Sequence, residues 1–279
     1  SQRVNNFKNW RELARQKIMK ICFLGCGNIA QAIIDGLLKS GMQPSNIACI
    51  ERNEHRVKLL KSQNLQIIEL DNLASLDFDL ILLAVKPKDA LSAEESIFKH
   101  APKAIILSVV AGIGIEKYSQ PKSIIRAMPN TACAFGKGVT AIYSVDQNSK
   151  AFILAKSLFK KVGHVLTLQN EEEMHRFTSI IGSGQAFLFL VLNTYLNELE
   201  KISSTDQVAT KSMFQDFISS LGDSFSQDLN FESLINKIKS PGGTTQAGLE
   251  SLENNNLDKI LQDAFQAAED RSIEISNEQ

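Results

Sequence analysis

Short apolar runs alternate with amphipathic stretches from Lys20 to about Leu168. The run Ile21–Leu24 precedes apolar residues at helical spacing between Ala30 and Leu38, and Gly41 closes that segment. Similar runs lie at residues 47–50, 66–69, 80–85, 104–110, 138–143 and 164–168, the last two flanking a helical stretch at 150–161. Apolar runs separated by helices predict a parallel sheet with helices on both faces.

Helical periodicity replaces the strand pattern after about Asn170. Ser204, Asp206 and Gln207 form a plausible helix start, and apolar stripes follow along Gln207–Phe225 and Leu257–Ala268. We therefore expect an N-terminal extension at 1–18, a doubly wound parallel α/β domain at 19–170 and an all-α domain at 171–279. The helical stripes, with the apolar face of residues 187–196, exceed what this domain can hide alone and predict a partner chain.

Composition narrows the class of partner. Lys and Arg total 30 against 31 Asp and Glu, so the net charge of −1 gives no reason to expect nucleic acid as a partner. The apolar runs are shorter than the roughly 18 residues of a membrane span, which predicts no membrane partner. The four cysteines, at positions 22, 26, 49 and 133, lack the spacing of a metal site. We therefore expect reduced thiols at Cys22, Cys26, Cys49 and Cys133, no bound metal and a cytoplasmic location. Residues 1–18 are basic and lack the apolar core of a secretory signal.

A G-x-G-x-x-A turn joins the first strand to the first helix. Gly25 permits the tight turn, Gly27 lets the backbone approach a pyrophosphate, and the small Ala30 allows close packing of helix on strand. The phosphates would lie at the helix N-terminus. This pattern predicts a Rossmann-type dinucleotide site.

The end of the second strand leaves the cofactor open. Glu51 in that place favours the ribose hydroxyls of NAD, whereas Arg52 can pair with the additional phosphate of NADP. The segments Ala84–Pro87 and Ser108–Ile113 end the fourth and fifth strands at the same sheet edge, where ligands of parallel sheets bind; each also has ordinary turn chemistry.

Two glycine-rich segments occupy the helical half. Ser240–Thr245, with the sequence Ser-Pro-Gly-Gly-Thr-Thr, offers free N–H groups and two hydroxyls to a substrate carboxylate, and it also suits a tight turn before a capped helix. Residues 181–184 place Gly182 and Gly184 within a helical stretch, which indicates close approach of another helix, chain or ligand. The four histidines share no motif, and hydride transfer requires none.

These segments, together with Arg126–Thr131, resemble pyrroline-5-carboxylate reductase from about Lys20 to beyond Glu250. The resemblance implies a Rossmann domain, a helical dimerisation domain and a homodimer or a ring of dimers. It implies hydride transfer from NADPH, or alternatively NADH, to the imine carbon of a cyclic imine carboxylate, giving L-proline. It also implies active sites that combine one subunit's Rossmann domain with helices of the other.

The resemblance assigns roles to individual residues. Thr245 is the expected catalytic hydrogen-bond donor to the imine nitrogen. The residues expected to bind substrate are Glu171, Thr178, Gly242, Gly243, Thr244 and Thr245. Those expected to line the cofactor are Leu24, Gly25, Cys26, Gly27, Asn28, Ile29, Arg52, Ala84, Val85, Lys86, Pro87, Val110, Ala111 and Gly112.

Several positions depart from the family pattern. Ile181, Gln185 and Phe187 replace a serine, a proline and a tyrosine that are usual there, and Ala132 replaces a proline. Two alternatives therefore stay open: a reductase of another cyclic imine, and a non-catalytic dinucleotide-binding protein that acts through protein interaction. Retention of Thr244 and Thr245 favours catalysis.

Overall fold

The computed structural model describes residues 19–202 and 206–278. These form two compact units, one comprising the chain up to Gly182 together with Asp270 onward, and the other Ser183–Glu269. The extension at 1–18 and the predicted helix-start residue Ser204 lie outside the described residues.

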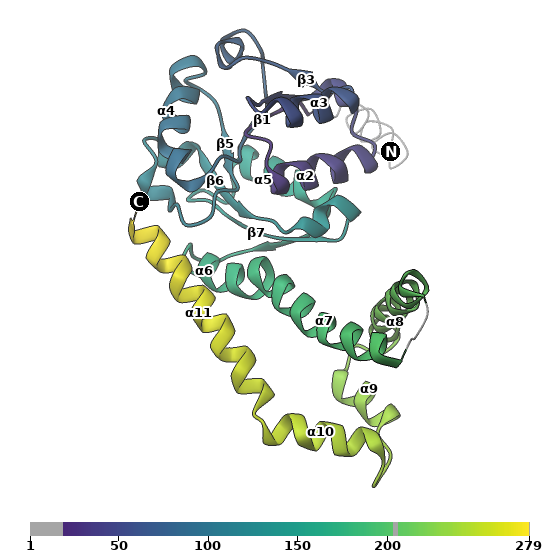
Figure 1. Ribbon diagram of the computed structural model, residues 1–279. Coiled ribbons are helices and arrows are strands. Elements are labelled where there is room, and N and C mark those ends of the chain that lie inside the picture. The colour runs from purple at the N-terminus through teal and green to yellow at the C-terminus, as the bar shows by residue number, and fades with distance from the viewer. Residues whose placement is uncertain (1–18, 203–205, 279) are drawn as a thin grey trace, which may run out of the picture. The chain divides into compact units, whose positions relative to one another are not determined.

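The first unit is built on an eight-stranded sheet in the order β3-β2-β1-β4-β5-β6-β7-β8 (Figure 1). Its strands are β1 Ile21–Leu24, β2 Ile47–Ile50, β3 Gln66–Ile67, β4 Leu80–Leu83, β5 Ile106–Ser108, β6 Ile124–Met128, β7 Gly138–Tyr143 and β8 Gly163–Thr167. Neighbouring strands are parallel except β6 and β7. The predicted parallel sheet is therefore confirmed in its main part.

The sequence pattern predicted neither the strand β6 nor the direction of β7. β6 coincides with the segment that begins the Arg126–Thr131 motif and was not predicted as a strand. β7 runs antiparallel to it because the connection, residues 129–137, holds only the short 3₁₀ turn Thr131–Phe135. A parallel return needs a crossover of a dozen or more residues.

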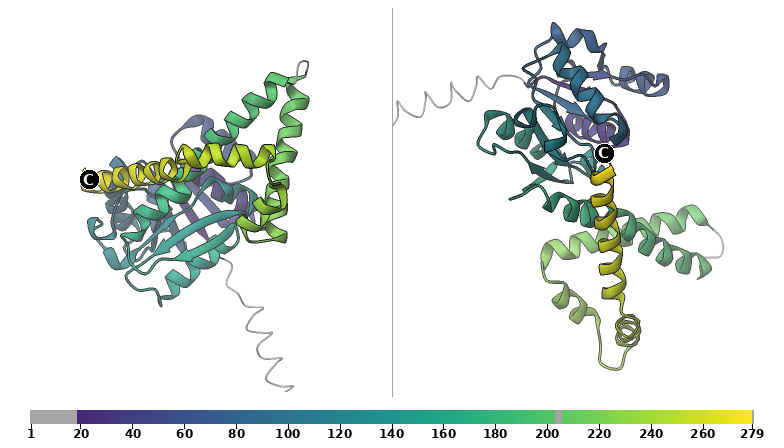
Figure 2. Two further views of the ribbon diagram at one scale, coloured as in Figure 1. Left: turned by 90° about the horizontal axis from the view of Figure 1, so that it is seen from below. Right: turned by 90° about the vertical axis from the view of Figure 1, so that its left-hand side faces the viewer.

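Alternate residues of the strands serve two separate cores. Ile21 and Phe23 pack with the helices α2 Asn28–Lys39, α3 Glu54–Ser62 and α5 Lys150–Lys160 on one face. Cys22 points to the other face, where it packs with α4 Ala90–His100 and the turns after β5. Helices thus cover both faces of the sheet (Figure 2), which explains why the strands are apolar throughout.

Helices joined by short turns make up the described part of the second unit. It contains α7 Gly184–Ile202, α8 Gln207–Gln227, α9 Phe231–Ile238, α10 Thr244–Asn254 and most of α11 Leu257–Glu278. Asp206 caps α8 by accepting the N–H groups of Val208 and Ala209 at 2.9 and 3.1 Å. Aromatic pairs join the helices, including Phe225 and Phe231, whose ring centroids are 4.4 Å apart.

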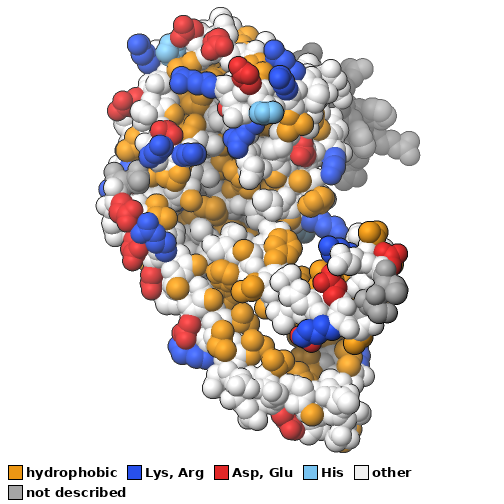
Figure 3. All heavy atoms as spheres, in the orientation of Figure 1, with side chains coloured by type: hydrophobic (Ala, Val, Ile, Leu, Met, Phe, Trp, Pro, Cys, Tyr) orange, Lys and Arg blue, Asp and Glu red, His pale blue; other side chains and the backbone are white. Residues whose placement is uncertain are grey.

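The helices of this unit leave many apolar side chains uncovered (Figure 3). On α7, Leu188, Phe189 and Leu190 are 64, 61 and 71% exposed. The longer helical stretch Glu173–Ile202 is long enough to span a membrane by length and composition alone, and an 18-residue window within it has a mean hydropathy of 1.4. Uninterrupted apolar runs did not reveal this segment, because polar residues divide it. An apolar helix face of this kind also suits a protein partner.

Candidate active site

A hollow of about 500 Å³ opens at the carboxyl ends of β1, β2 and β4. β1 lies between β2 and β4, so the chain crosses the sheet in opposite directions from this point, which is where open α/β sheets bind ligands. The hollow is lined by Leu24, Gly25, Ile50, Glu51, Arg52, Leu70, Val85, Asp89, Ser92, Ala93 and Ser96. Four of the residues predicted for the cofactor line it directly: Leu24, Gly25, Arg52 and Val85.

The remaining predicted cofactor residues lie along the same edge of the sheet. Cys26 and Gly27 complete the turn after β1, and Asn28 and Ile29 begin α2. Ala84 to Pro87 follow β4, and Val110 to Gly112 follow β5, which pairs in parallel with β4. The fold therefore brings the whole predicted set to the carboxyl ends of neighbouring strands.

The turn after β1 requires glycine at its first position. Gly25 has φ +84°, and a Cβ there would lie 2.8 Å from the carbonyl oxygen of Ala84. Its N–H donates to the Ile50 carbonyl at 3.0 Å. α2 then begins after Gly27, which has no side chain to accept the first N–H groups of the helix. These groups and the positive end of the helix dipole suit a phosphate.

Glu51 holds this turn against the end of β2. Its Oε2 accepts the N–H of Cys26, and its Oε1 accepts those of Arg52 and Asn53, each at 2.8 Å. Partial burial alone would raise the pKa of Glu51, but these three N–H groups and the charge of Arg56 outweigh it, so the pKa is lowered. The carboxylate is charged at neutral pH and committed to the backbone around it.

A second arginine lies against the glycine turn. The Arg56 guanidinium is 3.4 Å from the place of a Cβ on Gly27, while Arg52 is exposed on the rim of the hollow. Arg56 is not among the residues predicted from the sequence, although its place in the first turn of a helix that starts beside the dinucleotide edge could have indicated it. Two cations thus flank the site where an anionic cofactor would bind.

Most of the other lining residues that the sequence did not indicate come from α4 and from the turns before and after β4, the latter contributing Asp89. Leu70 and Ala93 are apolar, as is Val85, which the sequence did predict, whereas Ser92 and Ser96 are one helical turn apart and add hydroxyls. Apolar walls with a few polar groups suit an adenine base with its ribose. With the glycine turn and the two arginines, the residues present fit a dinucleotide.

The loop after β5 lies over a buried polar network. The Ser108 and Tyr118 hydroxyls are 2.8 Å apart, and burial raises the pKa of Tyr118, which keeps the phenol neutral. Arg126 of β6 and Glu171 form an ion pair of 2.7 Å, and the same Glu171 oxygen accepts the N–H of Ile115 at 2.8 Å. Glu171, predicted to bind substrate, thus has one oxygen engaged inside the protein.

Thr178 lies in a π-helical turn, Thr178–Ser183, and its hydroxyl donates to the Met174 carbonyl at 2.7 Å. Single π-turns are rare and are frequent at functional sites. A Cβ on Gly182 would make only an ordinary contact, 3.5 Å from a Thr178 methyl. Among the described residues of the unit that contains Gly182, none approaches it closely enough to require glycine.

The Ser240–Thr245 segment forms a tight turn that opens α10 in the second unit. Gly242 has φ +69°, Gly243 is the N-cap, and the Gly243 N–H donates to the Ser240 carbonyl at 3.0 Å. Thr244 and Thr245 occupy the first turn of the helix, and Thr245 is half-buried in this unit. The helix start and the substrate nest predicted from sequence share these residues, and the lack of a capping side chain leaves N–H groups for an anion.

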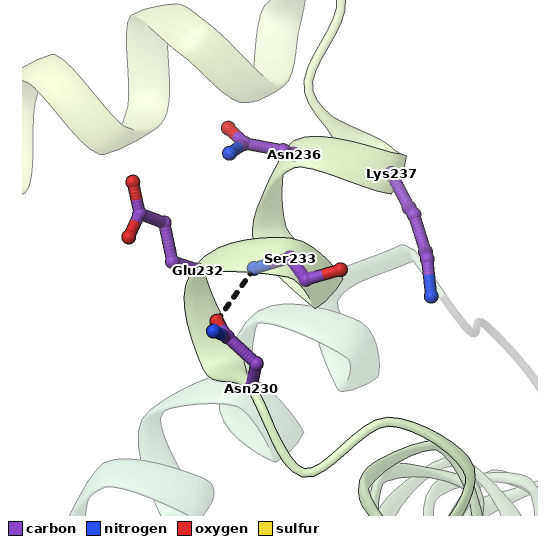
Figure 4. Close-up of a pocket in the computed structure, with 5 residues that line it drawn as sticks. All are labelled: Asn230, Glu232, Ser233, Asn236 and Lys237. Carbon is purple, nitrogen blue, oxygen red and sulfur yellow. Dashed lines mark hydrogen bonds between the residues drawn. The ribbon is translucent and has the colours of Figure 1, made fainter.

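A second hollow of about 500 Å³ lies at α9 and has a polar lining (Figure 4). The side chains around it are those of Asn230, Glu232, Ser233, Asn236 and Lys237, and Asn230 accepts the Ser233 N–H at 3.0 Å. That bond caps α9. No residue predicted for the site lines this hollow.

All four cysteines are buried free thiols, as the sequence predicted. Burial raises the pKa of Cys22 to about 12, and a hydrogen bond with Cys49 together with burial raises that of Cys26. These thiols stay protonated at neutral pH and are poor nucleophiles. Cys26 therefore serves the turn through its backbone.

Comparisons with known proteins match two parts of the chain to family models and most of its length to relatives. Residues 20–112 match the family described as "NADP oxidoreductase coenzyme F420-dependent", and residues 171–275 match "Pyrroline-5-carboxylate reductase dimerisation". Pyrroline-5-carboxylate reductase of Staphylococcus aureus is 33% identical over 93% of this chain and 98% of its own length. Pyrroline-5-carboxylate reductase 2 of Bacillus subtilis is 30% identical over 93% and 96%.

Solved structures give the same result. Plasmodium falciparum pyrroline carboxylate reductase, determined with NADP bound, superposes with a TM-score of 0.80 at 25% identity, covering 92% of this chain and 98% of its own. The enzyme of Coxiella burnetii gives 0.79 at 25% identity, with 93 and 99% covered. The fold, the site at the sheet edge and these relatives lead to one conclusion: the chain belongs to the pyrroline-5-carboxylate reductase family.

Proposed function

We propose that this chain reduces 1-pyrroline-5-carboxylate to L-proline with NADPH, with NADH as the alternative hydride donor. The observation that carries the proposal is the full-length similarity to reductases of this name, which spans both the dinucleotide edge and the helical region. The NADP in the Plasmodium falciparum relative supports the cofactor. When bound, the dihydronicotinamide supplies a hydride to the imine carbon, C2 of the pyrroline ring, which becomes C5 of proline, and the ring nitrogen takes a proton.

The residues of the first unit would bind and orient the cofactor. The start of α2 and the arginines Arg52 and Arg56 supply positive charge for its phosphates, and Gly25 leaves the space that the backbone needs. Val110, Ala111 and Gly112 follow β5 at the same edge, and they would border the nicotinamide. The protein's task is to bring the C=N carbon within a near-attack distance of about 3–3.5 Å.

The residues of the second unit would hold the substrate. The N–H groups of Thr244 and Thr245 in the first turn of α10, beside the turn at Gly242 and Gly243, suit its carboxylate, and the Thr245 hydroxyl would donate a hydrogen bond to the ring nitrogen. That bond would orient the C=N group and assist its protonation. The domain division that we propose is 19–170 for dinucleotide binding and 171–279 for substrate binding and dimerisation, after an extension at 1–18.

We further propose a homodimer or a ring of dimers, in the cytoplasm, in which each dimer is formed through the helical unit. The uncovered apolar face of α7 and the match to a dimerisation family support a partner chain in preference to lipid. A small cyclic imine carboxylate is the proposed ligand, with no nucleic acid or membrane partner.

The departures at Ile181, Gln185, Phe187 and Ala132 bear on the choice of imine. A test compares NADPH oxidation by the purified chain with pyrroline-5-carboxylate and with its six-membered-ring analogue. We expect turnover only when an imine is present, and faster turnover with the five-membered ring. A preference for the larger ring would favour another cyclic-imine reductase, and dinucleotide binding without any turnover would favour the non-catalytic alternative.

A further inference from the structure

Arg126 and Glu171 form an ion pair beneath the loop that follows β5. Arg126 Nη1 lies 2.7 Å from Glu171 Oε1, and the two side chains are 4 and 20% exposed. Removing one member of a buried pair leaves an uncompensated charge, so the two side chains hold each other in place. The pair fixes where the Glu171 carboxylate points.

The same carboxylate oxygen fixes the far end of that loop. Glu171 Oε1 accepts the Ile115 N–H at 2.8 Å, and at the near end the Val110 N–H donates to Ser108 Oγ at 3.3 Å. Between them Gly112, at φ +77°, packs so closely on Ile275 that a Cβ would lie 2.5 Å from its Cγ2. The loop is thus held at three points, and only the Glu171 contact depends on a charge.

This loop contains Val110 to Gly112, which the proposed function places against the nicotinamide. The adenosine hollow lies elsewhere, at the ends of β1, β2 and β4. A displacement of about 1 Å at a positioning element can slow a reaction by about 100-fold. A shift of this loop would therefore affect hydride transfer more than it affects binding of the adenosine half.

We infer that Glu171, oriented by Arg126, is a positioning residue that sets the loop at Val110–Gly112 for hydride transfer. The inference rests on the proposed function and extends it to residues that need not touch the reacting atoms. Gln in place of Glu171 keeps an oxygen for the Ile115 N–H, whereas Ala removes it. Loss of the oxygen should therefore cost more than loss of the charge.

The test measures three quantities for the wild-type chain, Glu171→Gln and Glu171→Ala: kcat, the isotope effect with NADPH deuterated at the transferred position, and the affinity for 2′,5′-ADP, which lacks the nicotinamide. We expect kcat to fall by about 10- to 100-fold in Glu171→Ala and by less in Glu171→Gln. The isotope effect should rise in the same order, because hydride transfer becomes slower than the steps around it. Affinity for 2′,5′-ADP should not change.

Two further variants separate positioning from stability. Arg126→Met combined with Glu171→Gln removes both charges, so the double variant should fold without an unpaired buried charge. Because Arg126 no longer orients the side chain at position 171, the isotope effect of the double variant should stay above the wild-type value. Glu94→Gln is the matched control. Glu94 is a carboxylate only 1% exposed, and it accepts the Ser119 N–H and hydroxyl at 2.9 and 2.7 Å. This control should lose stability without a change in the isotope effect.

The isotope effect distinguishes the two explanations, because loss of folded protein lowers the measured rate but leaves the isotope effect unchanged. An unchanged isotope effect in both single variants, or a parallel loss of 2′,5′-ADP binding, would overturn the positioning role while leaving the proposed function intact. A wild-type chain that folds, binds NADPH and does not turn over the imine would overturn the proposed function and this role together.

Discussion

Gly25, directly after β1, lies so close to Ala84, directly after β4, that position 25 has no room for a side chain. A Cβ on Gly25 would be 2.8 Å from the Ala84 carbonyl oxygen, and the backbone there has φ +84°. The turn that is to carry the pyrophosphate therefore depends on contact between two strand ends as well as on the glycine pattern.

Gly25→Ala should abolish dinucleotide binding and destabilise the first unit. Gly41→Ala is the control, because Gly41 has φ +92° with nothing within 4 Å of a Cβ. The control should pay only the left-handed backbone cost of about 1–2 kcal/mol and keep cofactor affinity. Thermal unfolding and fluorescence titration with NADPH measure both effects. If Gly25→Ala and Gly41→Ala lost equal stability and both still bound NADPH, the contact of Gly25 with Ala84 would not matter.

Arg52→Ala should weaken NADPH binding more than NADH binding, because only NADPH carries the phosphate that the guanidinium can pair with. Loss of one charge-assisted contact predicts about 1.5–3 kcal/mol, or roughly 10- to 150-fold, for NADPH alone. Lys61→Ala, at an exposed position near the end of α3, controls for the loss of a positive charge. Equal weakening for both cofactors would mean that Arg52 does not recognise the phosphate.

Thr245→Val should lower kcat by about 100-fold while leaving NADPH affinity unchanged, because it keeps the shape and removes the hydrogen-bond donor. Thr167→Val makes the same substitution at a position where the hydroxyl oxygen is buried and has no hydrogen-bond partner among the described residues. That control should keep full activity. Steady-state kinetics with both variants measure the difference, and an unchanged kcat in Thr245→Val would mean that Thr245 only packs.

Leu190→Glu should dissociate the dimer. Leu190 is 71% exposed on α7, and a charge there would be buried unpaired in the proposed interface. Leu59→Glu is the matched control, because Leu59 is 47% exposed on α3 of the first unit. Light scattering should report at least twice 30.9 kDa for the wild type and the control, and one chain for Leu190→Glu. A monomeric, fully active wild type would contradict the dimer proposal.

Local patterns predicted much of the fold. The strand runs, the helix after Gly25 and the helical second half follow from apolar periodicity, which responds to burial on two faces or on one. β6 escaped because Arg126 interrupts its apolar run; the arginine is tolerated there only because Glu171, 45 residues later, neutralises it. The direction of β7 depended on the length of its connection, and periodicity does not report direction.

The site was predictable to the extent that single segments define it. The glycine turn and the strand ends after β4 and β5 were found because each is contiguous in sequence. Ser92, Ser96 and Arg56 were missed because their side chains reach the edge of the sheet only after their helices pack. Glu171 came from the family resemblance, but its contact with Ile115 joins segments 56 residues apart, and no local pattern contains it.

In the proposed reaction, hydride passes from the cofactor to the imine carbon of pyrroline-5-carboxylate, which becomes C5 of proline. The most direct measurement is mass spectrometry and NMR of the product made with NADPH deuterated at the transferred position. The account predicts L-proline carrying one deuterium, bound to C5, formed in equal amount to the NADPH consumed. Proline without deuterium at C5, or NADPH consumption without proline, would contradict it.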